Sequence, residues 1–291
     1  MPSTQALLGG LRSVVAGKER YVDMALEVVG PKGDLIITAG GVWDTLLRRF
    51  DPERKACPRR VRVTRAQERA ARQLAAWFQD YEADKADRIA LEVYVDNRRG
   101  GKTFFACLFV ILVVLRYPRS HLGRTLGWIV CPTFPQQREV LETIGRILPS
   151  EWLREGGPWK FQRTERIFSL PTGAQLQLKS ADRPQTLKAG GVAVIAVNEA
   201  TQCSAKAVLI CLGNNIDSGG ITALAMNPPD STVGLWAEKL HEAIEEAGAQ
   251  GGPLLDFVRE TRFPPAGNDQ INQAARTRFQ TLAKILDPVA E

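Results

Sequence analysis

The sequence has few of the residues that build metal centres or disulfide frameworks. Among its 291 residues are five cysteines, none in a C-x-x-C spacing, and two histidines, His121 and His241. An odd, scattered set of cysteines is typical of a reduced, intracellular protein, and two distant histidines do not make a histidine-built metal site. We therefore expect neither a secreted disulfide scaffold nor a zinc protein.

A membrane-spanning segment is also missing from the sequence. The most apolar stretch, residues 104–115, is 12 residues long, whereas a helix needs roughly 20 residues to cross a bilayer. The first 30 residues contain charged side chains and no long apolar run, so they do not resemble a secretory signal. We expect residues 104–115 to form a buried helix in a soluble protein with no membrane partner.

Hydrophobic residues, at 44%, are abundant enough for a folded core, and the formal net charge is +6. The positive charge is local, because residues 48–73 hold ten basic and three acidic side chains and carry a net +7 on their own. Such a run is either a solvated helix face or a contact for the phosphate backbone of a nucleic acid.

From residue 88 onward, segments typical of strands alternate with segments typical of helices. The expected strands are 89–95, 126–130, 192–197 and 221–226, a hairpin is expected over 166–170 and 174–178, and the expected helices are 102–115, 135–148, 204–213 and 235–247. Gly213 and Gly248 are the expected stops of the last two helices. This alternation predicts an α/β fold with a mainly parallel sheet flanked by helices.

The chain is expected to divide into a small N-terminal part and a larger domain. Over residues 1–60 the apolar patches 24–29 and 42–47 are interpreted as short helices, separated by glycine and proline. The α/β pattern then occupies about residues 61–265.

The strongest functional signal is the segment 96–103, Asp-Asn-Arg-Arg-Gly-Gly-Lys-Thr, which follows the first expected strand and opens the apolar helix. That is the context of a phosphate-binding loop. Gly100 and Gly101 would let backbone N–H groups approach phosphate oxygens at a helix start. Lys102 would place a charge on the β- and γ-phosphates, and Thr103 would offer a hydroxyl to Mg²⁺.

Two arginines, Arg98 and Arg99, lie inside this loop. They are either exposed side chains on a turn or charges that stabilise the γ-phosphate in the transition state.

A second motif is the apolar strand 192–197 followed by Asn198 and Glu199. A P-loop NTPase needs an acidic residue at the end of a neighbouring strand, where it steadies the Mg²⁺ shell and orients the attacking water. Glu199 is the candidate catalytic carboxylate. Asn198 occupies the metal-side position, where it can hold a coordinated water but brings no charge. The alternative is a core strand that ends in glutamate by chance.

Two weaker signals complete the candidate site. Thr222, in the strand that precedes Asn227 and two prolines, is a possible γ-phosphate sensor, although a strand followed by a proline turn explains it equally well. Gln67, upstream of the loop, is a candidate adenine contact.

Four stretches of the sequence together resemble the ATPase domain of the large terminase subunit of tailed bacteriophages. They are Asn97–Thr103, Val130–Thr133, Leu178–Gly190 and Val194–Ala200. The stretch 180–190 is the most telling, because it is similar to the family's serine-aspartate-proline-leucine-glycine segment ahead of the acidic strand. The resemblance covers about residues 60–260 and implies a P-loop ATPase fold of the ASCE type.

The resemblance implies a motor that uses ATP and Mg²⁺ to move double-stranded DNA into a procapsid. Such subunits form a homo-oligomeric ring on the portal protein, although a monomer in isolation is compatible with this, and a small terminase subunit recognises the genome. The implied location is the host cell cytoplasm, with transient docking on the procapsid.

The resemblance also implies roles for individual residues. Asn97 joins the nucleotide-binding loop, Arg98 or Arg99 is the P-loop arginine, and Gln67 falls in the adenine-contacting motif. Asn227 falls in the coupling motif. A basic residue that reaches into the neighbouring subunit's site is also implied, and Arg183 and Lys188 are the candidates.

The sequence departs from the family pattern at three points. Asp96 replaces a small loop residue, and Asn198 replaces an aspartate, which would weaken Mg²⁺ binding. The last 30 residues hold only Asp269, Asp287 and Glu291 as acidic residues, too few for the family's nuclease site. Residues 266–291 are therefore expected to form a helix or linker toward a nuclease domain that the chain lacks.

Two other functions are compatible with the same residues. One is a helicase-like P-loop remodeller of nucleic acids. The other is a nucleotide-binding assembly module whose turnover is weak because of Asn198.

Overall fold

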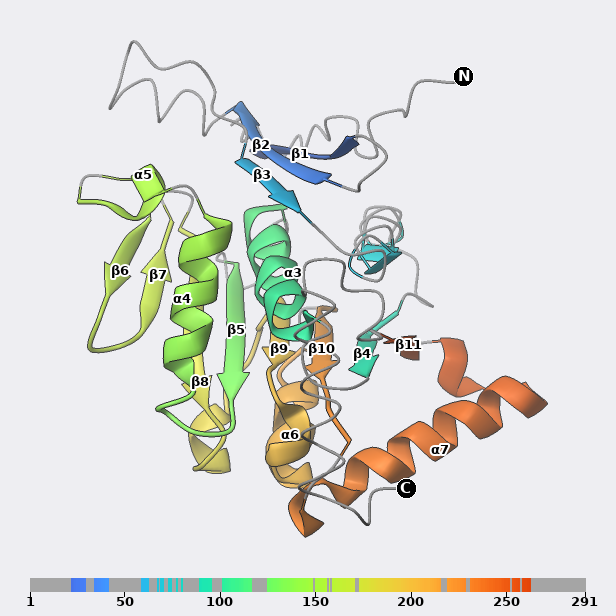
Figure 1. Ribbon diagram of the computed structural model, residues 1–291. Coiled ribbons are helices and arrows are strands. Elements are labelled where there is room, and N and C mark those ends of the chain that lie inside the picture. Colours follow the sequence, from blue (N-terminus) through green and yellow to red (C-terminus); the bar gives the residue numbers. More distant parts are fainter. Residues whose placement is uncertain are drawn as a thin grey trace, which may run out of the picture.

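The computed structural model describes residues 67, 69, 70, 73, 74, 77, 80, 89–95, 101–116, 125–148, 150–155, 157, 159–170, 173–215, 219–228, 231–251, 253–256 and 258–262, and the backbone of 22–29, 34–41 and 59–62. They form a small three-stranded sheet near the N-terminus and a large eight-stranded sheet (Figure 1). The candidate site belongs to the large sheet.

The large sheet confirms the predicted α/β fold. Its strands, in spatial order, are β11 (Val258–Arg262), β4 (Leu91–Val95), β10 (Ile221–Ala225), β9 (Val194–Val197), β5 (Leu126–Cys131), β8 (Gln175–Ser180), β7 (Ile167–Ser169) and β6 (Lys160–Gln162). The first six are parallel to one another, and β7 and β6 are antiparallel. The central parallel strands are buried apolar runs, as expected of a sheet that is covered on both faces.

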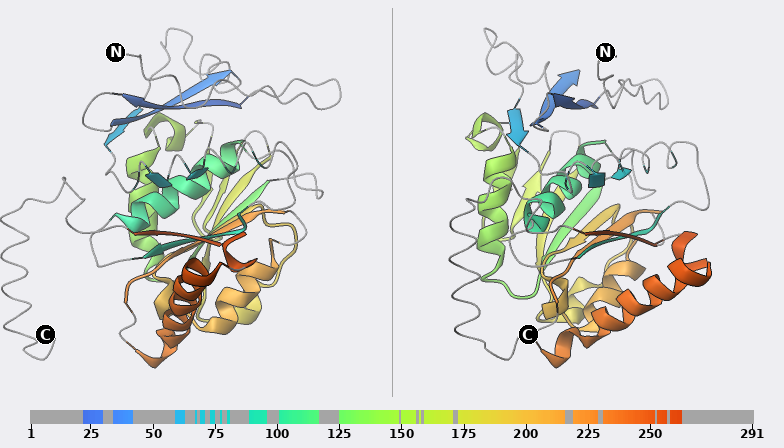
Figure 2. Two further views of the ribbon diagram at one scale, coloured as in Figure 1. Left: turned by 90° about the vertical axis from the view of Figure 1, so that its right-hand side faces the viewer. Right: turned by 45° about the vertical axis from the view of Figure 1, so that its right-hand side comes forward.

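Helices cover the two faces of this sheet, as the edge-on view in Figure 2 shows. On one face lie α3 (Lys102–Arg116) and α4 (Gln137–Ile147), and on the other lie α6 (Ala205–Gly213) and α7 (Leu235–Gln250). Short helices are α5 (Ser150–Leu153), η1 (Pro184–Leu187), η2 (Ala200–Gln202), η4 (Thr232–Gly234) and η5 (Pro253–Asp256). Each face therefore has its own hydrophobic core.

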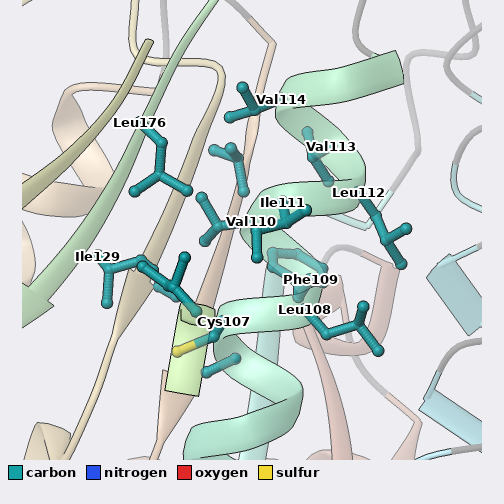
Figure 3. Close-up of a cluster of buried hydrophobic side chains, with 14 of the residues drawn as sticks. Cys107, Leu108, Phe109, Val110, Ile111, Leu112, Val113, Val114, Ile129 and Leu176 are labelled. Atoms are coloured by element: carbon teal, nitrogen blue, oxygen red, sulfur yellow. The ribbon is translucent and has the colours of Figure 1, made fainter. Parts of the chain in front are cut away.

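Helix α3 is the predicted buried helix. Its residues 105–114 are all at most 2% exposed, and Figure 3 shows side chains of this stretch packed beside Ile129 and Leu176 of the sheet. The packing is close at Gly127, where an added Cβ would lie 2.3 Å from Cγ2 of Val114. In the part of the chain that the structure describes, no helix is long and apolar enough to span a membrane.

The hairpin predicted over 166–178 is confirmed as β7 and β8, with Gly173 at the turn in the left-handed region (φ 83°). Strand β6 adds a third antiparallel strand that the sequence did not reveal. It has only three residues, Lys-Phe-Gln, and only one of them is apolar.

The helical prediction for residues 24–29 is wrong. Residues Val22–Val29 form β1, which pairs with β2 (Asp34–Gly41), and β2 pairs with β3 (Arg59–Arg62), both antiparallel. The two-residue alternation of Val22, Met24, Leu26 and Val28, followed by Gly-Pro-Lys-Gly, is typical of a hairpin. The predicted helix at 42–47 lies outside the described residues, as do residues 266–291.

Two further elements differ from expectation. Helix α7 continues past Gly248 to Gln250, and the glycine that ends it, with a positive φ of 71°, is Gly251. Strand β11 was not predicted, because its sequence, Val-Arg-Glu-Thr-Arg, is mostly polar.

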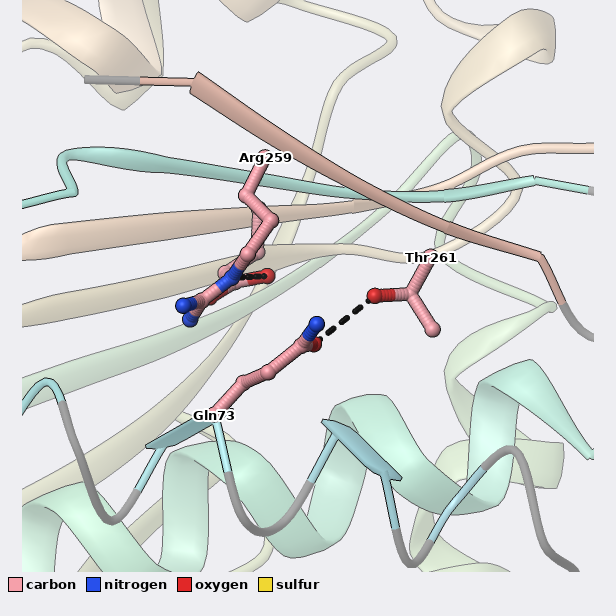
Figure 4. A network of polar contacts seen from close by, with 4 residues as sticks. Gln73, Arg259 and Thr261 are labelled. Atoms are coloured by element: carbon pink, nitrogen blue, oxygen red, sulfur yellow. Dashed lines mark hydrogen bonds and ion pairs between the residues drawn. The ribbon is translucent and has the colours of Figure 1, made fainter. Parts of the chain in front are cut away.

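Strand β11 is held to the sheet by polar contacts on its α3 side (Figure 4). Arg259 pairs with Glu92 of β4, and Thr261 donates a hydrogen bond to Oε1 of Gln73, 2.8 Å away. Burial raises the pKa of Glu92, although Arg259 acts in the opposite direction.

Candidate nucleotide-binding site

The parallel register brings the candidate site residues to one edge of the large sheet. Val197 lies opposite Leu224 of β10 and Val130 of β5, and Cys131 lies opposite Ser180 of β8. The turns that follow β4, β10, β9, β5 and β8 therefore meet at the carboxyl edge. Ligands of open α/β sheets bind at this edge.

The start of α3 stands at the carboxyl end of β4. Gly101 has φ 82°, a conformation that favours glycine, and its carbonyl accepts the first helical hydrogen bond from Phe105 at 3.0 Å. Lys102 is 6% exposed, and Thr103 is half-buried beside it. The preceding loop, Asp96–Gly100, which includes Asn97, Arg98 and Arg99, lies outside the described residues.

Gln67 contacts the loop directly. Its Nε2 donates to the carbonyl oxygen of Gly101 at 3.0 Å, and its side chain is buried. A Cβ at Gly101 would lie only 2.5 Å from that nitrogen. The sequence suggested Gln67 as an adenine contact, and this stays a prediction. The structure shows that Gln67 braces Gly101, the last glycine of the loop.

Glu199 adopts a strained conformation in the turn after β9. Its φ of 50° and ψ of 49° are left-handed, which is uncommon for a residue with a side chain. The half-buried carboxylate accepts a hydrogen bond from Nδ2 of Asn227, with 2.5 Å between Nδ2 and Oε2. The structure thus brings together Glu199 and Asn227 from neighbouring strands.

Asn198, one residue before, is 3% exposed and extends the sheet, since its backbone N–H donates to the carbonyl of Val130 at 2.8 Å. Its Oδ1 is buried and makes no hydrogen bond with any residue that the structure describes, and the same holds for Oδ1 of Asn227. Buried oxygens without partners are costly unless a ligand or water satisfies them. These atoms fit a site for Mg²⁺, which prefers oxygen ligands.

Thr222 is not brought to this edge. It pairs with Leu91 and Ile195, near the amino ends of β4 and β9, and its buried Oγ1 makes no hydrogen bond within the described part of the chain. Thr222 lies three residues before Ala225, the last residue of β10, which is roughly 10 Å along the strand at about 3.3 Å per residue. Asn227, not Thr222, is the polar residue that β10 delivers to the site.

Strand β9, which Glu199 follows, was expected to lie beside β4, which precedes the phosphate loop, but one strand separates the two. Strand β10 lies between β4 and β9 and pairs with both. Non-consecutive pairing of this kind leaves no mark in the local sequence.

The two candidate trans-acting residues lie at opposite ends of the strands. Arg183 follows the carboxyl end of β8, since Ala181 donates from its backbone N–H to the carbonyl of Cys131. Lys188 lies toward the amino end of β9, because Asn214 bonds Leu187 and Ala189 on either side of it and also Val192. Both side chains are exposed. Asn214 was missed by sequence reasoning, because a single asparagine at a helix end carries no pattern.

Sequence reasoning also missed a link between the turn after Glu199 and the loop between β5 and α4. Nε2 of Gln136 donates to Oε1 of Gln202 at 2.8 Å, and Oε1 of Gln136 accepts from both the backbone N–H and the hydroxyl of Thr133. Nearby, burial raises the pKa of Cys131 to about 12, so this thiol stays protonated and is not a nucleophile.

No protein-family model and no curated protein match the sequence. Solved structures do match. The large terminase from a thermophilic bacteriophage has a TM-score of 0.55 at 15% identity over 75% of this chain and 49% of that chain. The same terminase in complex with ADP has a TM-score of 0.53 at 16% identity over 75% and 50% of the two chains. Its complex with ATP-γ-S has 0.51 at 15% identity over 75% and 48%.

The chain therefore has the P-loop fold seen in large terminases, which confirms the resemblance found in the sequence. It spans about half the length of the terminase chain that it matches, 49% in the first of these structures. At this level of identity the likeness establishes the fold, and neither the helicase nor the assembly-module alternative is favoured by it.

Proposed function

We propose that this chain is the ATP-hydrolysing motor domain of a phage DNA-packaging terminase. The observation that carries the proposal is that Lys102, at the start of α3, and the Asn227-bonded Glu199 both lie at the carboxyl edge of the parallel sheet on a terminase fold. The terminase of the thermophilic phage, which shares this fold, has been solved with ADP and with ATP-γ-S, and this supports a nucleotide as the ligand.

The residues for ATP and Mg²⁺ follow from this arrangement. Asn97, Gly100, Gly101 and Lys102 would hold the phosphates, with Gln67 bracing Gly101 near the base. Thr103 and Oδ1 of Asn198 would hold the Mg²⁺ shell. The bound Mg²⁺ would supply positive charge against the phosphate oxygens.

Glu199 would accept the proton of the attacking water as general base. Its hydrogen bond from Nδ2 of Asn227 orients the carboxylate and couples β9 to β10. Arg98 or Arg99 would add charge at the γ-phosphate from within the loop.

A complete site would take a basic residue from a neighbouring copy. Of the two candidates, Arg183 lies near its own nucleotide edge, whereas Lys188 lies toward the other end of β9. We propose Lys188 for the trans role, since it has no nucleotide of its own within reach.

The partners of this motor would be double-stranded DNA, the portal protein, a small terminase subunit and further copies of the chain in a ring. Its place would be the host cytoplasm, docked on the procapsid during packaging. The basic segment 48–73, with its net charge of +7, is the proposed contact for DNA phosphates.

The test is steady-state ATP hydrolysis with Mg²⁺ at high protein concentration, with and without duplex DNA. Lys102→Ala should abolish turnover, because the phosphates lose their main point charge. Lys160→Ala, which removes an exposed lysine from β6, is the matched control and should hydrolyse ATP like the unmodified protein. Turnover that does not depend on Lys102, or no turnover at all, would refute the proposal.

A further inference from the structure

Gln136 joins two segments at the carboxyl edge of the large sheet. It lies between β5 and α4, and its Nε2 donates to Oε1 of Gln202, in the turn that follows Glu199, at 2.8 Å. Its Oε1 accepts from the backbone N–H and from the hydroxyl of Thr133, each at 3.0 Å. Both polar atoms of one amide are used, and they connect the segment after β5 with the segment after β9.

The neighbours of Gln136 fix the orientation of its amide. A backbone N–H can only donate, so the atom that faces Thr133 must be the amide oxygen, and the amide nitrogen must face Gln202. Gln202 in turn must present its oxygen. The link therefore requires a donor at position 136 and an acceptor at position 202, and each requirement can be removed separately by substitution.

Gln202 is the residue through which this link reaches Glu199. Its backbone N–H donates to the carbonyl of Glu199 at 2.9 Å and so closes the turn η2. Glu199 begins that turn with a left-handed φ of 50° and ψ of 49°, a conformation that persists only where the surroundings hold it. The backbone of Glu199 is thus held by Gln202, and its carboxylate is held by Asn227.

The loop that carries Gln136 is fixed at other points as well. The guanidinium carbon of Arg166, just before β7, lies 4.8 Å from the ring centroid of Phe134. The backbone N–H of Gln137, at the start of α4, donates to the carbonyl of Phe134 at 3.2 Å. Gln136 can act as a brace because its own position does not depend on Gln202 alone.

The link itself should add little to the stability of the fold. Gln202 is exposed and Gln136 is half-buried, so water competes for the hydrogen bond between them. Ordering two glutamine side chains also costs rotamer entropy. Neither side chain belongs to the two hydrophobic cores. Loss of the link should therefore displace Glu199 rather than unfold the domain.

We infer that Gln136 is a positioning residue for Glu199, which acts through Gln202 to hold the left-handed turn and so keeps the carboxylate in place for the attacking water. The inference rests on the proposed ATPase function and extends the site to the loop after β5, from which no residue had been assigned.

The test is steady-state ATP hydrolysis by the whole chain with Mg²⁺ over a range of ATP concentrations. Gln136→Ala, Gln202→Ala and the double variant are compared, and thermal unfolding shows whether each is folded. We expect each single variant to lower kcat by about tenfold and to leave KM for ATP within about twofold, because other residues hold the nucleotide. Gln162→Ala, which removes an exposed glutamine from β6, is the matched control and should behave like the unmodified chain.

The double variant distinguishes one shared link from two separate effects. It should be no slower than the slower single variant, because both glutamines act through the same hydrogen bond. Losses that multiply to about a hundredfold would show independent effects and overturn the inference. Gln202→Glu keeps an acceptor for Nε2 of Gln136, so it should regain most of the kcat lost in Gln202→Ala. Equal kcat in Gln202→Glu and Gln202→Ala would also overturn the inference.

Three further results separate this inference from the proposed function. Lys102-dependent turnover in the unmodified chain, with kcat changed by less than about twofold in Gln136→Ala and Gln202→Ala, overturns the positioning role alone. A lower unfolding midpoint together with a higher KM would mean that Gln136 serves the fold, and it has the same consequence. Absence of Lys102-dependent turnover overturns the proposed function and the inference with it.

Discussion

The two ends of the large sheet differ in how completely their polar groups are satisfied. At the carboxyl end, Glu199 is left-handed and Oδ1 of Asn198 is buried without a partner among the described residues. Toward the amino end, Glu92 is paired with Arg259, and both Nδ2 and Oδ1 of Asn214 make hydrogen bonds. There are exceptions there, since the buried hydroxyl of Thr222 and the indole N–H of Trp128, at the same level of the sheet, have no hydrogen-bond partner in the described chain.

The comparison separates residues kept for chemistry from residues kept for the fold. Strain and unsatisfied oxygens cost stability, so they persist where a ligand repays them. Paired groups hold strands together and need no ligand. Substitutions at the carboxyl end should therefore change turnover more than stability, and substitutions toward the amino end should do the reverse.

The largest effect is expected at Glu199. Glu199→Gln keeps the side-chain shape but cannot accept a proton, so turnover should fall by about 10²- to 10⁴-fold. Titration with a fluorescent ATP analogue should show binding within a few-fold of the unmodified chain, and the unfolding free energy should hardly change. A variant that still hydrolyses ATP at the normal rate would remove Glu199 from the site.

At the other end, Arg259→Ala should reduce stability and leave the site chemistry alone. It leaves the buried Glu92 carboxylate without its cation, at a cost of about 3 kcal/mol near pH 7. The pKa of Glu92 is already raised by burial, and losing Arg259 raises it further. The charged form is the costly one, so the destabilisation should be fully present above the raised pKa and should shrink as the pH falls through it.

Urea unfolding at several pH values tests this sign. The double variant Glu92→Gln/Arg259→Ala has no carboxylate to bury, so its stability relative to the unmodified chain should lose most of this extra pH dependence. A destabilisation by Arg259→Ala that is equal at pH 5 and pH 8 would contradict the account.

The same two ends show what the sequence could predict. Helix α3 and strands β4, β5, β9 and β10 were found because each is a mostly apolar run beside clear turn signals. The phosphate loop, Glu199 and Asn227 were proposed for the site because their residue types and order follow from phosphate chemistry and from a family resemblance. The structure brings Glu199 and Asn227 together, and their roles stay predictions.

What could not be predicted depends on contacts between distant segments. The insertion of β10 between β4 and β9 arises from sheet pairing, which local sequence does not encode, and the depth of Thr222 in the sheet follows from that pairing. Strand β11 is polar because Arg259 and Thr261 find partners elsewhere in the fold. The role of Asn214 depends on the segment Leu187–Ala189, with which its side chain makes hydrogen bonds.

A smaller effect is expected from restoring charge beside Glu199. Asn198→Asp puts a carboxylate where an amide oxygen has no described partner, so Mg²⁺ should bind more tightly and turnover should rise by about tenfold, or about 1.4 kcal/mol. The new buried charge should also lower stability without Mg²⁺ and nucleotide, and both together should restore it. Equal rates for Asn198→Asp and the unmodified chain over a Mg²⁺ titration would show that this position does not limit turnover.

The smallest effect is expected at the start of α6, where the two kinds of residue adjoin. Oγ of Ser204 caps the helix by accepting from the backbone N–H of Ala207 at 3.3 Å. Ser204→Ala should cost about 1 kcal/mol of unfolding free energy, measured by urea. Turnover should change less than twofold, because the turn after Glu199 is held separately by the bonds from Gln136 to Gln202 and from Trp236 to the carbonyl of Cys203. Ser204→Thr keeps the cap and should lose less stability. A large loss of turnover in Ser204→Ala would mean that the cap, rather than those two bonds, sets the position of Glu199.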